Sequence, residues 1–197
     1  MNRRAWGGGA AALLLCAAFA HYCVRIVPAD APQRASAPPE PRAAPPRADR
    51  PVATGALLIP VEGIPPSALV DTFSQARAGG ARPHEAIDIM AARGRPVLAA
   101  ADGRVEKLFW SEEGGRTLYQ RSADGRLVYY YAHLDSYAPG LSEGQALRRG
   151  QTVATVGSTG NADEAAPHLH FAVHVMRPGE PWYGGRPINP YPLLVRP

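Results

Sequence analysis

The chain has 197 residues and a formal net charge of +4, enough for one globular domain with appended segments and too little for two full domains. Its 21 prolines and 20 glycines are unevenly placed, and composition divides the chain near residue 52. Both cysteines, Cys16 and Cys23, precede that point. The later part can therefore use neither disulfides nor thiolate chemistry, and any metal there must be held by nitrogen and oxygen.

Residues 1–27 have the layout of an export signal. Arg3 and Arg4 precede a short apolar run that ends at the small residue Ala20. The apolar character continues in HYCVRIV, so we expect either a signal peptide cleaved after Ala20 or an uncleaved membrane anchor. Neither cysteine follows the small residue of a lipoprotein signal, which argues against lipidation. The segment predicts export, to the periplasm or anchored at the inner membrane.

Residues 28–52 are rich in proline, alanine and arginine and offer almost nothing to bury. We expect a disordered linker that samples extended polyproline conformations and tethers the following domain. Its arginines outnumber its acids. They either keep the linker solvated or attract it to anionic lipid or wall polymer.

Residues 53–197 alternate short β-prone runs with turn signals, which predicts a mainly β domain with little helix. Asp-Gly pairs at 102–103 and 124–125 lie between runs rich in Val, Leu and Tyr and predict hairpin turns. Residues 65–79 could hold one short helix or a loop. Gly79 and Gly80 suggest a mobile loop beside the first candidate ligand, and GSTGNA suggests a turn beside a cleft.

The segment RPHEAIDIM places His84 and Asp88 four residues apart, which brings both side chains to one side of either a strand or a helix turn. The pair can share an ion, or it can be a surface hydrogen-bonded pair. It is not the helical H-E-x-x-H zinc motif, so Glu85 is not assigned that motif's general-base role.

In LVYYYAHLD, strict alternation puts Tyr129, Tyr131 and His133 on one face of a strand. The two tyrosines are candidate substrate contacts, with packing in the core as the alternative. A single histidine at the end of a strand is also commonly structural or exposed.

In PHLHFAVHV, His168, His170 and His174 share one face, and the apolar Leu169, Phe171 and Val173 form the other. The apolar face predicts docking on a core. The histidine face fits an active site, but taken alone it equally fits a wet surface.

The order H-x-x-x-D, Y-x-H-L and H-L-H-F resembles the lysostaphin-type and LytM-type zinc endopeptidases that cut peptidoglycan peptides. The resemblance implies a small antiparallel two-sheet β fold with a groove. It implies zinc ligands at His84, Asp88 and His170, a catalytic pair of His133 and His168, and an ordinary role for His174. Where the family usually has glycine, this chain has Ala86, which a backbone at positive φ would resist.

The resemblance implies a Zn²⁺-dependent endopeptidase acting on peptidoglycan stem or cross-link peptides, with no nucleic-acid partner. Three ligands with one open position are typical of catalytic zinc. His168 is then the expected general base, and His133 supports the oxyanion or the leaving group, although the two roles could be exchanged. The alternative is a non-hydrolytic regulator with the same fold. Relatives of that kind have usually lost metal ligands, which this chain keeps.

Overall fold

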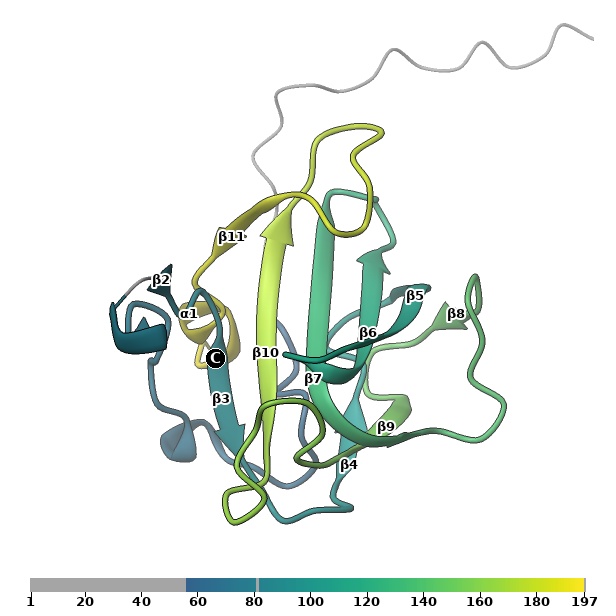
Figure 1. Ribbon diagram of the computed structural model, residues 1–197. Helices are drawn as coiled ribbons and strands as arrows, with labels where there is room; N and C mark the ends of the chain where they lie inside the picture. Colours follow the sequence, from purple (N-terminus) through teal and green to yellow (C-terminus); the bar gives the residue numbers. More distant parts are fainter. Residues whose placement is uncertain (1–55, 81, 197) are drawn as a thin grey trace, which may run out of the picture. The chain divides into compact units, whose positions relative to one another are not determined.

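The described strands belong to one nine-stranded antiparallel sheet and one two-stranded hairpin (Figure 1). The structure is a computed structural model that describes residues 56–80 and 82–196. The expected signal or anchor at 1–27 and the linker at 28–52 lie outside these residues. Within the described part, no helix is long and apolar enough to cross a membrane.

Within residues 56–80 and 82–196, helical structure is restricted to short turns, and the strands are mostly short. The elements in chain order are η1 (Pro66–Ala68), β1 (Ala76–Arg77), η2 (Ala78–Gly80), β2 (Arg82–Pro83), β3 (Ile87–Met90), β4 (Pro96–Leu98), β5 (Gly103–Ser111), β6 (Gly115–Ser122), β7 (Leu127–Tyr137), β8 (Ala146–Leu147), β9 (Thr152–Val156), β10 (His168–Val175), β11 (Arg186–Ile188) and α1 (Tyr191–Leu194). The prediction of a mainly β domain with little helix is confirmed.

Only one of the two predicted Asp-Gly hairpins forms. Asp124 and Gly125 lie in the turn between the paired strands β6 and β7, and Gly125 has φ 74°. At 102–103 the prediction is wrong, because β4 pairs with β9 while β5 pairs with β6 and β8. The backbone of Gly103 instead lies so close to a neighbouring strand that an added Cβ would clash with the carbonyl oxygen of Arg121.

The hydrophobic core is built on the apolar face of the central strands. Leu169, Phe171 and Val173 of β10 are fully buried, as the alternation predicted for this strand. Ile87 and Ile89 of β3 pack in the same cluster. Because successive strand residues point to opposite faces, this packing directs the intervening polar residues of β3 and β10 to the other face.

Strands β3, β10 and β7 lie side by side and carry the candidate site (Figure 1). Their register puts His170 of β10 directly opposite Asp88 of β3 on one side and Ala132 of β7 on the other. Residues that are far apart in the sequence therefore meet in one row across the sheet.

Candidate active site

The carboxylate of Asp88 and the imidazole of His170 meet because their strands are paired in this register. Asp88 Oδ1 lies 3.1 Å from His170 Nδ1. Directly opposite residues of an antiparallel pair have Cβ atoms only about 4.5–5.5 Å apart, so the contact needs no unusual rotamer. The strand register, which is fixed by burial of the apolar faces of β3 and β10, therefore places Asp88 beside His170.

His84 reaches the same point from the segment between β2 and β3. Its backbone N–H donates to the carbonyl of Gln75, and the next residue, Glu85, has φ 59°. The side chain is buried, with Nδ1 3.1 Å from the carbonyl oxygen of Thr72. If Nδ1–H donates to that carbonyl, the Nε2 lone pair is left facing Asp88 and His170.

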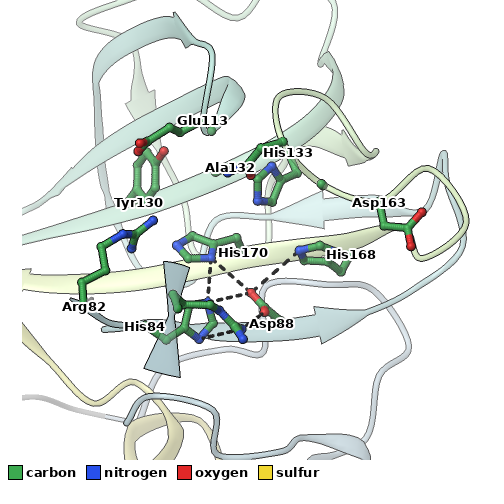
Figure 2. Close-up of a pocket in the computed structure, with 14 residues that line it drawn as sticks. Arg82, His84, Asp88, Glu113, Tyr130, Ala132, His133, Asp163, His168 and His170 are labelled. Carbon is green, nitrogen blue, oxygen red and sulfur yellow. Dashed lines mark hydrogen bonds and ion pairs between the residues drawn. The ribbon is translucent and has the colours of Figure 1, made fainter. Parts of the chain in front are cut away.

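His84, Asp88 and His170 form a group that could hold a metal ion, since one ligand atom from each lies within 4.8 Å of the others (Figure 2). His84 Nε2 is 3.0 Å from His170 Nδ1 and 3.1 Å from Asp88 Oδ1. A tetrahedral ion bound at about 2.0–2.1 Å keeps such ligand atoms roughly 3.3 Å apart. The spacing and the two-imidazole, one-carboxylate donor set therefore fit a divalent zinc ion.

Asp88 is held as a carboxylate. Burial raises its pKa, but hydrogen bonds with His170 and His84 outweigh burial, and the pKa lies far below its ordinary value. Its second oxygen, Oδ2, accepts a hydrogen bond of 2.6 Å from the Arg77 guanidinium. Oδ1 is thus the oxygen left for an ion, while Arg77 fixes the orientation of the carboxylate.

His133 enters the site through an irregularity in β7. The β6–β7 register shifts between Arg116 and Leu118, and His133 has φ 59°. Its backbone N–H donates to the carbonyl of Gly114. This bulge takes His133 out of the strand's alternation and brings its ring 4.9 Å from that of His168, centroid to centroid.

Both histidines of this pair are oriented through Nδ1. His133 Nδ1 lies 2.8 Å from the carbonyl oxygen of Thr159, and His168 Nδ1 lies 2.8 Å from that of Ala166. A carbonyl can only accept, so each Nδ1 carries a proton and the Nε2 of each ring is the atom that can accept one. His168 Nε2 is 3.8 Å from Asp88 Oδ1.

His133 is neutral around pH 7. Burial lowers its pKa to about 4, against the opposing effect of its hydrogen bond to Thr159. Burial also lowers the pKa of His170. Both rings are therefore in the form that accepts a proton or binds a metal ion.

The expectation that Tyr129 and Tyr131 contact the substrate is wrong. Tyr131 is fully buried; its hydroxyl donates to Gln120 Oε1 at 2.6 Å and accepts from the backbone N–H of Ala100. Tyr129 is 3% exposed and belongs to the same core cluster. Because the bulge separates His133 from the strand's alternation, the tyrosine that lines the cleft is Tyr130, close to His170 (Figure 2).

The cleft has a volume of about 500 Å³ and is lined by all five predicted ligand and catalytic residues. Asn161 lines it too, so the GSTGNA turn lies beside the cleft as expected. His174, expected to be an ordinary strand residue, is outside this lining, with Nδ1 3.1 Å from the carbonyl oxygen of Gly184. Ala86 is fully buried, and the positive φ falls on Glu85 instead.

Two groups of residues in the site were missed. Thr72 and Thr159 act through backbone carbonyls, which carry no sequence signal. Arg77 and Arg82 line the cleft from the β1–β2 hairpin. The two arginines are placed symmetrically around Gly79 and Gly80, a pattern that predicts a tight hairpin. The expectation of a helix or loop over 65–79 did not take this pattern into account.

The model of peptidase family M23 matches residues 82–190. Among curated proteins, the L-Ala–D-Glu endopeptidase of Bacillus subtilis is 35% identical over 62% of this chain and 38% of its own length. The DD-carboxypeptidase/endopeptidase Mpg of Neisseria meningitidis is 35% identical over 58% and 23%. The murein hydrolase activator NlpD of Escherichia coli is 29% identical over 64% and 29%. The chain therefore spans well under half the length of these relatives.

Solved structures with this fold include two peptidases. A protein from Ruminococcus gnavus, described as a "putative glycyl-glycine endopeptidase lytM", is 33% identical with a TM-score of 0.55, covering 64% of this chain and 52% of its own. The catalytic domain of lysostaphin from Staphylococcus simulans is 28% identical with a TM-score of 0.54, covering 63% and 89%. Together with the family match, these similarities confirm the resemblance to lysostaphin-type and LytM-type peptidases, and the chain belongs to peptidase family M23.

Proposed function

We propose that this chain is a zinc-dependent endopeptidase that hydrolyses amide bonds in peptidoglycan stem or cross-link peptides. The observation that carries the proposal is the convergence of His84, Asp88 and His170 within ligand distance of one another, beside His133 and His168. The signal-like layout of residues 1–27 supports a location outside the cytoplasm, in the periplasm or at the inner membrane.

His84, Asp88 and His170 would hold the zinc ion, leaving a fourth position for solvent or substrate. A bound zinc ion lowers the pKa of water towards about 7 and polarises a carbonyl, which supplies both the nucleophile and the electrophile for amide hydrolysis. Arg77 keeps Asp88 in place through Oδ2, while Oδ1 contacts the other two ligands.

His168 serves as the general base and accepts the proton of the attacking water at Nε2. The nearby Asp88 carboxylate stabilises the imidazolium that results, because the two groups are 3.8 Å apart. That proton then passes to the leaving amine. His133, buried and neutral, accepts or returns a proton at its own Nε2 across the same cleft.

The names of two relatives support a narrower substrate class. The Bacillus relative is named for the bond between L-Ala and D-Glu, and the Neisseria relative for carboxypeptidase as well as endopeptidase activity. A glutamate residue and a peptide C-terminus both bring a free carboxylate near the bond that is cut. We therefore assign to this chain peptides that carry such carboxylates, in preference to all-glycine bridges.

A second candidate function is activation of another wall hydrolase without catalysis, and the match to the Escherichia activator NlpD supports it. The five polar side chains gathered in the cleft favour hydrolysis, since an activator that only binds a partner needs no paired histidines beside a ligand set.

Digestion of isolated muropeptides separates the two candidates. The purified protein, loaded with one equivalent of zinc, is incubated with muropeptides, and products are identified by mass spectrometry. Hydrolysis should yield two peptide products per bond, stop on chelation and be absent from Asp88→Asn. Unchanged muropeptides, together with stimulation of a separate wall hydrolase, would contradict the endopeptidase and favour the activator.

A further inference from the structure

The β1–β2 hairpin presents two arginines to one wall of the cleft. Arg77 ends β1 and Arg82 begins β2, and the two are directly opposite each other in the antiparallel register. Both side chains line the cleft. Like charges in directly opposite positions destabilise a two-stranded pair, unless an anion lies between or beside them.

The two arginines differ in the partners that they already have. Arg77 donates to Asp88 Oδ2 at 2.6 Å and to Gln75 Oε1 at 3.3 Å. Arg82 forms no hydrogen bond or ion pair with any residue of 56–80 or 82–196, and its guanidinium points into the cleft towards Tyr130 (Figure 2). The cleft-lining acids Glu113 and Asp163 are not paired with it within those residues. The guanidinium of Arg82 therefore has N–H donors that no described residue occupies.

A guanidinium fork matches a carboxylate, which accepts two parallel N–H hydrogen bonds. Arg77, opposite Arg82, adds positive potential and is itself in contact with the metal-ligand group. Arg82 lines the same cleft as the ligand group, and its cross-strand neighbour Arg77 contacts Asp88. A carboxylate bound at Arg82 would therefore lie on the part of the peptide close to the scissile bond.

We propose that Arg82, assisted by the charge of Arg77, binds a free carboxylate of the substrate peptide close to the bond that is hydrolysed. This inference rests on the proposed endopeptidase function and makes its substrate class specific. It predicts that the enzyme discriminates between a stem peptide and the same peptide with that carboxylate amidated. Peptides without a carboxylate near the scissile bond, such as oligoglycine, are then poor substrates.

The test compares two synthetic stem peptides that differ only in a free or amidated carboxylate at the residue following the scissile amide. For the wild type we expect kcat/KM to be roughly 10- to 100-fold higher for the free carboxylate, the range for a hydrogen bond to a charged group. Arg82→Gln should lose that preference, mainly through KM, and still bind zinc. Arg148→Gln, the same charge change at an exposed arginine outside the cleft lining, should keep it.

A binding measurement removes any dependence on turnover. With chelator-treated protein, calorimetry should give a dissociation constant for the carboxylate peptide that rises about ten-fold or more in Arg82→Gln. The value in Arg82→Lys should be intermediate, because lysine keeps the charge without the fork.

The outcomes separate this inference from the function on which it rests. Equal hydrolysis of both peptides by the wild type, or a preference that survives in Arg82→Gln, would overturn the carboxylate site alone. Failure of the wild type to hydrolyse any muropeptide would overturn the proposed function.

Discussion

His133→Asn tests the role of His133 without disturbing the backbone that places it. Asparagine adopts the left-handed conformation more readily than most residues, so it suits the observed φ of 59°. Its side-chain amide can also replace the hydrogen bond that His133 Nδ1 makes to the Thr159 carbonyl at 2.8 Å. The change therefore removes the proton acceptor Nε2 and little else.

The expected loss is in turnover. His133 is outside the group of ligand atoms that converge on one point, so zinc content should stay at the wild-type level. Losing a proton-transfer group lowers kcat by roughly 10²- to 10⁴-fold, equal to about 3–5 kcal/mol of transition-state stabilisation. His133→Ala should show the same kinetic loss and be less stable than His133→Asn, because alanine tolerates positive φ less well than asparagine and loses the hydrogen bond to Thr159.

The assay pairs steady-state hydrolysis of a muropeptide with metal analysis and urea unfolding of the same preparations. His174→Asn is the matched control, since it changes a histidine that also contacts a backbone carbonyl but is outside the cleft lining. It should keep its activity. Wild-type turnover in His133→Asn would refute the assignment of proton transfer to this residue, and loss of zinc would show that it is a ligand.

Two further predictions concern stability. Tyr131→Phe should lower the free energy of unfolding in urea by about 1–3 kcal/mol, because the side chain of Gln120 and the backbone N–H of Ala100 lose the hydroxyl that both contact. Its kcat should stay unchanged, and a large fall in kcat would return Tyr131 to the substrate site. In the metal-free protein, the free energy of unfolding should decrease as the pH falls from about 6.5 to about 4. The pKa of His133 is lowered to about 4 in the folded protein, so over this range the histidine is protonated in the unfolded chain before it is protonated in the folded one. Stability is thus fully present above the unfolded pKa, and His133→Asn should flatten the curve; the same pH dependence in both proteins would contradict the low pKa.

Strand alternation predicted the parts of the site that lie on regular strands. On β10 the apolar residues Leu169 and Phe171 are buried, and His168 and His170 face the cleft. His84 and Asp88 also meet, but His84 precedes the strand and Glu85 between them has a positive φ, so strand alternation does not account for this contact. On β10, burial of the apolar face directs the alternate residues to the opposite face, and the alternating sequence pattern predicts both faces.

Alternation failed on β7, where the backbone is irregular. The register shift beside Leu118 and the positive φ at His133 move this residue to the face opposite to the one that counting assigns. Nothing in YYYAHLD marks a bulge, since no glycine or asparagine occurs there. Long-range contacts, such as the hydrogen bond from the His133 N–H to the Gly114 carbonyl, decide the geometry.

The Asp-Gly pair at 102–103 shows the same limit for turns. Asp124 and Gly125 join two strands that pair with each other, whereas Asp102 and Gly103 lie between strands that pair elsewhere. Local turn chemistry is similar at both places. Strand partners depend on the whole sheet, which a short segment does not encode.

The most direct test of the central claim is metal stoichiometry. We expect the wild type to bind one zinc ion per chain, measured by inductively coupled plasma mass spectrometry after dialysis against trace zinc. His170→Ala should bind none under the same conditions, and His174→Ala should still bind one. Full zinc content in His170→Ala would contradict the convergence of His84, Asp88 and His170 on a single ion.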